Sequence, residues 1–190
     1  IYPFASAKAK EKNADGSLKN EEYANRAKDI TVRLQKGEEK YKKAWEKIMK
    51  VSIADLKKNY DALDVHFEIW KGESDAEPYF PRLIEILEEK GLSYRSNGAL
   101  VVDIAEPGDK KELPPCMILK SDGASLYSTS DLGTIMDREK CYPKDWYLYI
   151  ADSRQDLHYT SFFRVARKAE LLPKTTKMNF LGFGTMNGKD

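Results

Sequence analysis

Cysteine and histidine are scarce in this chain of 190 residues, which has two of each. Cys116 and Cys141 form no Cys-x-x-Cys pair, so a dense disulfide framework is excluded and a reducing, intracellular setting is favoured. His66 has no second histidine or cysteine nearby in the sequence, whereas a metal ion needs several such ligands. We therefore expect two free or buried thiols and no metal site.

The sequence also lacks a long apolar run and an excess of one charge. No run reaches the roughly 18 residues that cross a bilayer, and no signal peptide is evident. The 32 Lys and Arg residues nearly balance the 31 Asp and Glu residues, so the net charge of +1 produces no overall field that points to nucleic-acid binding. We expect a soluble, cytoplasmic protein with no membrane partner and with enough apolar residues for one good core or two small ones.

Residues 1–62 are expected to form a helical region. Apolar residues recur at helical spacing from Glu21 to Gln35, and Gly37 is placed to end that helix. The same spacing returns at Tyr41, Ala44, Trp45 and Ile48, and Ser52-x-x-Asp55 resembles a capping box that opens a further helix. The sequence predicts successive helices whose charged faces are exposed to solvent.

A strand and a small insertion follow. Alternation of Val65, Phe67 and Ile69 with polar residues predicts a strand over 65–70. Residues 73–120 read as a small α+β insertion, because they combine a helix over 80–90, a hairpin over 94–104 that turns at Asn97-Gly98, and a strand over 116–120.

The remainder alternates between helix and strand, with helices over 129–141 and 156–170 and strands over 146–151 and 177–184. Alternation of this kind is typical of parallel strands joined by right-handed crossovers. We therefore assign residues 63–72 and 121–190 to a partial Rossmann-type core. The fold class is α/β: a partial Rossmann-type parallel sheet with a helical N-terminal region and a small α+β insertion.

Polar residues lie where such sheets place ligands, which is at strand ends and the starts of the following helices. They are Tyr127, Asp131, Gln155 and His158. The same stretch carries three linked motifs: Ser121-Asp122-Gly123, Tyr127-x-Thr129-x-Asp131 and Gln155-Asp156-Leu157-His158.

These motifs, in this order, resemble the second half of the catalytic domain of arginyl-tRNA synthetase, a class I aminoacyl-tRNA synthetase. Phe180 to Asp190 resembles the segment before that family's second ATP loop, and the resemblance is strongest from Leu63 onward. It implies an arginine–tRNA ligase, which activates L-arginine with ATP and transfers it to tRNA(Arg). It further implies Mg²⁺ accompanying ATP, no tightly bound cofactor, and a monomer.

The resemblance also implies roles for five residues. Glu73 and Asp131 hold the side chain of the substrate arginine, with Tyr127 packing or hydrogen-bonding beside it. Carboxylates suit this task because they pair with a guanidinium through two directed, charged hydrogen bonds. Gln155 contacts the amino acid, and His158 lies near the adenosine or ribose of ATP.

Plainer interpretations of the same residues stay open. An Asp in a helix first turn is favoured by the helix dipole alone, a Glu after a strand is usually a loop charge, and a Tyr beside a helix start is usually core. His158 could simply bond a neighbouring loop, and Ser153-Arg154 could stabilise its own loop or meet phosphate.

Departures from the family pattern indicate a central fragment. The HIGH-type ATP motif is absent, the KMSKS-type loop would begin after Asp190, and the anticodon-binding helical domain is missing. Ser130 stands where many relatives carry Arg. Because the cationic donors that stabilise charge on the phosphates come from those two motifs, we expect this chain alone to be inactive and to contain no catalytic residue.

Two other classes of protein remain possible from the sequence. A Rossmann-like nucleotide-binding or regulatory module would bind adenine nucleotide but not arginine. A structural interaction domain would bind neither and would expose an apolar stripe at Tyr41, Trp45 and Ile48.

Overall fold

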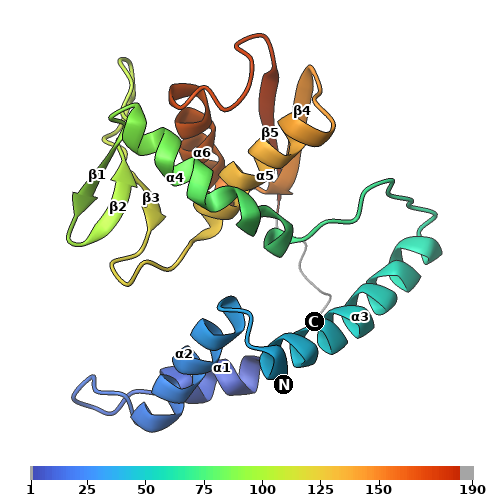
Figure 1. Ribbon diagram of the computed structural model, residues 1–190, viewed down its shortest axis with the longest axis vertical. Coiled ribbons are helices and arrows are strands. Elements are labelled where there is room, and N and C mark those ends of the chain that lie inside the picture. The colour runs from blue at the N-terminus through green and yellow to red at the C-terminus, as the bar shows by residue number, and fades with distance from the viewer. Residues whose placement is uncertain (1, 185–190) are drawn as a thin grey trace. The chain divides into compact units, whose positions relative to one another are not determined.

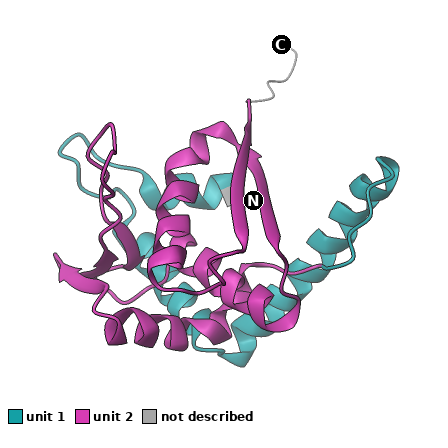
Figure 2. Cartoon of the chain, turned by 90° about the horizontal axis from the view of Figure 1, so that it is seen from above, with its two compact units in different colours: residues 1–69 teal, residues 70–190 magenta. Residues whose placement is uncertain are grey.

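The computed structural model describes residues 2–184, and the chain divides into two compact units, residues 1–69 and residues 70–190 (Figure 2). Among the described residues, no helix is long and apolar enough to cross a membrane.

The first unit is helical, as the sequence predicts. Its helices are α1 (Tyr2–Lys10), α2 (Glu21–Gln35) and α3 (Glu39–Ala62) (Figure 1). The predicted helix start at Ser52-x-x-Asp55 is wrong, because α3 runs through it without a break. Glycine and proline are absent from α3, so nothing in the local sequence interrupts it. Of the predicted apolar stripe, only Ile48 is exposed, while Tyr41 and Trp45 are half-buried.

The strand predicted over 65–70 is also wrong. This segment has no regular secondary structure, and Val65, Phe67 and Ile69 are 37%, 48% and 48% exposed. Alternation shows that a segment could serve as a strand, but a strand forms only when a neighbour pairs with its backbone. No strand within residues 2–184 pairs with 65–70.

The second unit begins with the short 3₁₀ helix η1 (Glu73–Tyr79), which leads directly into α4 (Phe80–Glu89). Strands β1 (Ser93–Ser96), β2 (Ala99–Val102) and β3 (Cys116–Leu119) then form an antiparallel sheet in that order. The hairpin predicted at Asn97-Gly98 is confirmed, and these residues take φ values of 49° and 81°. Asn and Gly are the residues that most readily adopt such left-handed conformations in a two-residue turn.

A helix–strand alternation completes the unit. Its elements are α5 (Tyr127–Cys141), β4 (Trp146–Asp152), the short 3₁₀ helix η2 (Ser153–Gln155), α6 (Asp156–Lys168) and β5 (Lys177–Phe183). β4 and β5 pair in parallel across α6, from Trp146 opposite Lys177 to Asp152 opposite Phe183. The predicted parallel pair is therefore confirmed. The described residues contain only these two parallel strands, so the Rossmann-type sheet is partly present. Of Phe180 to Asp190, which resembles the segment before the family's second ATP loop, residues 185–190 lie outside the described residues.

The core of this unit lies where α4, α5 and α6 meet the antiparallel sheet and β4. Fully buried side chains from each helix face one another, among them Leu83, Leu87, Leu132, Ile135, Phe162 and Val165. β2 and β3 add Val102 and Ile118 to the same cluster. The helices are thus held by apolar burial on both sides of α5, which fixes the ends of α5 and α6 relative to each other.

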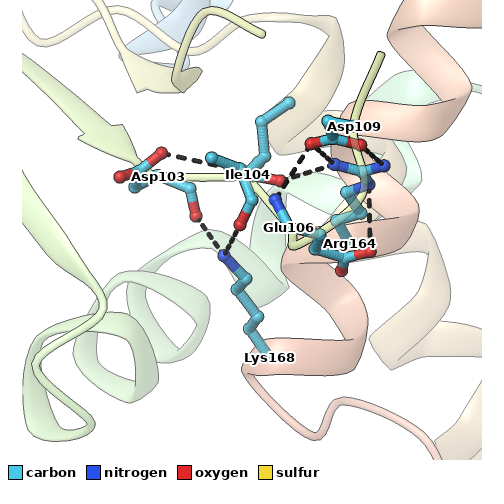
Figure 3. Close-up of polar contacts among 7 residues, drawn as sticks. Asp103, Ile104, Glu106, Asp109, Arg164 and Lys168 are labelled. Atoms are coloured by element: carbon cyan, nitrogen blue, oxygen red, sulfur yellow. Dashed lines mark hydrogen bonds and ion pairs between the residues drawn. The ribbon is translucent and has the colours of Figure 1, made fainter. Parts of the chain in front are cut away.

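A charged cluster attaches the loop after β2 to α6 (Figure 3). Arg164 donates two hydrogen bonds to Asp109, at 2.7 and 2.6 Å, and a third to the backbone oxygen of Ile104 at 2.8 Å. Lys168, one turn further along α6, donates to the backbone oxygen of Asp103 at 2.7 Å. The hydrogen bonds from Arg164 lower the pKa of Asp109 to about 2. Ionised side chains therefore help to hold this loop, in addition to the burial of Ile104 in the core.

Candidate functional site

The start of α5 is built around a buried threonine. Thr129 is fully buried, and its hydroxyl accepts the Leu126 N–H at 3.1 Å and donates to the backbone oxygen of Ile118 in β3. Capping of this kind satisfies an N–H that the first turn of a helix leaves without a partner. It also attaches the helix start to the antiparallel sheet, which fixes the direction in which Tyr127 and Asp131 leave α5.

Asp131 and His158 are direct partners. The Nε2 atom of His158 lies 2.6 Å from Oδ2 of Asp131, and the two side chains are 26% and 35% exposed. Asp131 comes from the second turn of α5 and His158 from the first turn of α6. The His158 ring packs against Tyr159 and Phe162, with ring centres 5.6 and 5.2 Å away. The two helices therefore present a carboxylate and an imidazole at one half-buried point.

The other three predicted site residues have exposed side chains. Glu73 is the first residue of η1, Tyr127 is the first residue of α5 and is 71% exposed, and Gln155 directly precedes α6. Within residues 2–184, we find no hydrogen bond or ion pair from these three side chains. The structure thus joins Asp131 to His158 by a direct contact and shows no such contact for Glu73, Tyr127 or Gln155.

An aromatic layer lies behind the Asp131–His158 pair. Tyr149 of β4 packs against Tyr159 and Phe163 of α6, at 5.5 and 5.1 Å between ring centres, and Tyr159 stacks on Phe180 of β5 at 4.4 Å. Burial raises the pKa of Tyr149 to about 12. These rings form an apolar support that keeps water from one side of the pair, which strengthens its electrostatic interaction with any charged ligand.

Sequence reasoning missed a second polar cluster, centred on Asp137 of α5. This carboxylate is 5% exposed. It accepts hydrogen bonds from Lys71 Nζ at 2.5 Å, Tyr79 OH at 2.9 Å, Tyr142 OH at 3.1 Å and Cys141 Sγ at 3.6 Å. Two of these donors precede α5 by many residues, so no local motif could have revealed the cluster; the only signal was an Asp on the apolar side of a helix.

The loop before α6 is stabilised internally. Arg154 donates two side-chain hydrogen bonds to Asp152, each 2.8 Å long, and the Arg154 N–H donates a third at 2.9 Å. The bidentate pair holds the guanidinium at the end of β4, which supports the interpretation that Arg154 stabilises its own loop. Among residues 2–184, no group of three or more His, Cys, Asp or Glu side chains is arranged to hold a metal ion.

Comparison with known proteins identifies the family. A family model described as "tRNA synthetases class I (R), catalytic domain" matches residues 7–190. The chain belongs to this family. The resemblance found in the sequence motifs is therefore confirmed, and the α5–α6 site lies within a class I (R) synthetase catalytic domain.

Relatives of this class I (R) synthetase domain are arginine–tRNA ligases. The protein of that name from Agathobacter rectalis is 51% identical over 190 residues, and the one from Alkaliphilus oremlandii is 43% identical over 190 residues. The chain spans 30% and 31% of their respective lengths. The crystal structure of arginyl-tRNA synthetase from Plasmodium falciparum shares the fold, with a TM-score of 0.74 and 24% identity over 86% of this chain and 28% of that one.

Proposed function

We propose that this domain is part of an arginine–tRNA ligase, which joins L-arginine to ATP as arginyl-adenylate, releases pyrophosphate, and transfers arginine to tRNA(Arg). The observation that carries this proposal is the Asp131–His158 contact, at 2.6 Å, where α5 meets α6. It supports one site at which an amino-acid side chain and a nucleotide are held next to each other. We further propose that the ligase acts as a monomer.

Asp131 and Glu73 are the proposed partners of the substrate guanidinium. Two ionised carboxylates brought close together repel each other unless a cation lies between them. The guanidinium supplies that cation, and its planar fork of donors can pair with both carboxylates at once. Tyr127, which is 71% exposed at the start of α5, is free to pack over the bound side chain.

Gln155 and His158 are the proposed contacts to the rest of the substrates. Both lie at the start of α6, where backbone N–H groups and the helix dipole favour groups of negative charge. Gln155 has an exposed amide to hydrogen-bond the amino acid, and His158 adjoins the ribose or adenine. Mg²⁺ is expected to arrive with ATP, because it usually binds through substrate phosphates and few protein ligands.

The test is pyrophosphate exchange, with tRNA(Arg) present, by a full-length ligase that contains this chain. L-Arginine should support exchange of labelled pyrophosphate into ATP, whereas L-citrulline should not, because its neutral ureido group cannot neutralise two carboxylates. Equal exchange with both amino acids, or ATP binding without any response to arginine, would contradict the proposal. The second of these outcomes would favour a nucleotide-binding module that lacks ligase activity.

A further inference from the structure

The two ends of the segment 71–79, which contains η1, are bound to one buried carboxylate. Lys71, two residues before η1 begins, donates to Oδ2 of Asp137 at 2.5 Å, and Tyr79, the last residue of η1, donates to Oδ1 at 2.9 Å. The carboxylate therefore closes the segment 71–79 into a loop whose two ends meet on α5. Glu73 lies inside this loop.

The middle of η1 packs against Gly133 of α5, which lies one turn closer than Asp137 to the start of the helix. A Cβ atom added at Gly133 would lie 3.0 Å from the backbone oxygen of Ala76 and 3.2 Å from its Cβ atom. Ala76 itself is 2% exposed. The lack of a side chain at Gly133 thus allows the η1 backbone to approach α5 closely. This contact brings Ala76, in the middle of η1, to a point on α5 that is nearer than Asp137 to Tyr127 and Asp131.

The protonation states favour this contact at neutral pH. Burial opposes ionisation of Asp137, but hydrogen bonds from Lys71, Tyr79 and Tyr142 outweigh it and lower the pKa of the carboxyl group. The hydrogen bond to Asp137 raises the pKa of Lys71, and the same interaction raises the pKa of Tyr79 to about 12. At neutral pH, a carboxylate faces an ammonium group and a neutral hydroxyl, so each hydrogen bond is assisted by charge.

We propose that Asp137 is a positioning residue for the amino-acid substrate: by binding Lys71 and Tyr79, it fixes Glu73 at the separation from Asp131 that one guanidinium can bridge. This inference rests on the proposed function, because it assigns Glu73 and Asp131 to the same ligand. Asp137 itself contacts no substrate, since its carboxylate is buried and its hydrogen-bonding capacity is occupied by protein donors.

The chain offers a matched control at Tyr142. Its hydroxyl also donates to Asp137, at 3.1 Å, but Tyr142 directly follows α5 and does not belong to η1. Tyr79→Phe and Tyr142→Phe each remove one phenol hydrogen bond from the same carboxylate. Only the first releases an end of η1. The Tyr142→Phe variant also retains an aromatic ring below the Lys71 ammonium, which lies 5.3 Å from the centre of the Tyr142 ring.

The experiment measures arginine-dependent pyrophosphate exchange, with tRNA(Arg) present, in the full-length ligase that contains this chain. Lys71→Met and Tyr79→Phe should each raise KM for L-arginine about tenfold while KM for ATP changes less than about twofold, because only the guanidinium site is displaced. Tyr142→Phe should leave both constants within about twofold of the parent. Lys71→Arg, which keeps a cation beside Asp137, should restore most of the affinity for arginine.

The melting temperature of each variant separates positioning from general destabilisation. Tyr79→Phe and Tyr142→Phe should lower it by similar amounts, so a difference in KM between them cannot come from stability alone. Equal KM for arginine in these two variants, or a parallel rise in KM for ATP, would overturn the role of Asp137. If the parent ligase shows no arginine-dependent exchange, the proposed function itself fails.

Discussion

His158 and Asp131 lie on different helices, yet their side chains are 2.6 Å apart. The resemblance assigns the first to ATP and the second to arginine, so the two halves of the proposed site are in direct contact. A change in the charge of one side chain therefore alters the surroundings of the other. Substitutions of Asp131 and of His158 should therefore have non-additive effects on the kinetics of the ligase.

Asp131→Asn in the full-length ligase removes one charge at nearly constant shape. Losing a charged hydrogen bond in a half-buried site costs about 2–4 kcal/mol, so kcat/KM for arginine should fall about 30- to 1,000-fold. The measurement is pyrophosphate exchange at saturating ATP. An unchanged kcat/KM for arginine would remove Asp131 from the guanidinium site.

A double-mutant cycle tests whether the contact itself matters. Asp131→Asn, His158→Ala and the double variant should give an interaction free energy of about 0.5–3 kcal/mol in kcat/KM for arginine, because the two groups share one hydrogen bond. Asp131→Asn combined with Asp109→Asn serves as the control pair, since Asp109 is bound to Arg164 and not to this site. Strict additivity in the first cycle would mean that the contact carries no functional coupling.

Gly133→Ala tests the close approach of η1 to α5. The added methyl group would lie 3.0 Å from both the Ala76 oxygen and a Phe80 ring carbon, so these neighbours would have to move by a few tenths of an ångström. Overpacking of this kind costs about 1–3 kcal/mol in free energy of unfolding, measured by urea denaturation of the chain. Gly72→Ala is the control, because a Cβ atom there meets nothing within 4 Å. A loss of stability no greater at Gly133 than at Gly72 would contradict the packing.

Local signals predicted much of this fold, and their failures have a common cause. Asn97-Gly98 identified the hairpin, and the alternation after residue 127 identified α5, β4, α6 and β5, because the turn chemistry and periodicity lie within each segment. The prediction of a strand over 65–70 failed because a strand needs a partner strand. The periodicity of apolar residues within a segment does not reveal whether a partner is present. The same limit applies to the size of the parallel sheet.

Site residues divide in the same way. Linked motifs single out Asp131 and His158 as candidates, but their contact follows from the packing of α5 on α6, which spacing alone does not show. Asp137 was missed because its main partners, Lys71 and Tyr79, are brought to it by η1. Residues that act through a distant partner are the hardest to find in one sequence, since only the fold brings them together.

Stability in acid should depend on the ionisation of Asp109. The carboxyl group has a pKa of about 2 in the folded chain, below its ordinary value of 3.8, because Arg164 donates to it. A depressed pKa means that the folded state favours the ionised form, so the stabilisation is complete above the ordinary pKa and is lost as pH falls toward the folded value. Asp109→Asn should therefore be less stable than the parent chain at pH 5, and the difference should shrink steadily between about pH 4 and pH 2.

Urea denaturation of both chains across this pH range measures the difference in their free energies of unfolding. The contributions of the other carboxylates cancel in this difference, because both chains share them. Glu106→Gln is the control at pH 5. It removes a longer contact to the same Arg164, 3.5 Å rather than 2.6 Å, from a side chain that is 47% exposed, so its effect should be smaller. A difference between Asp109→Asn and the parent that stays constant from pH 5 to pH 2 would show that ionisation of Asp109 does not hold the loop after β2 on α6.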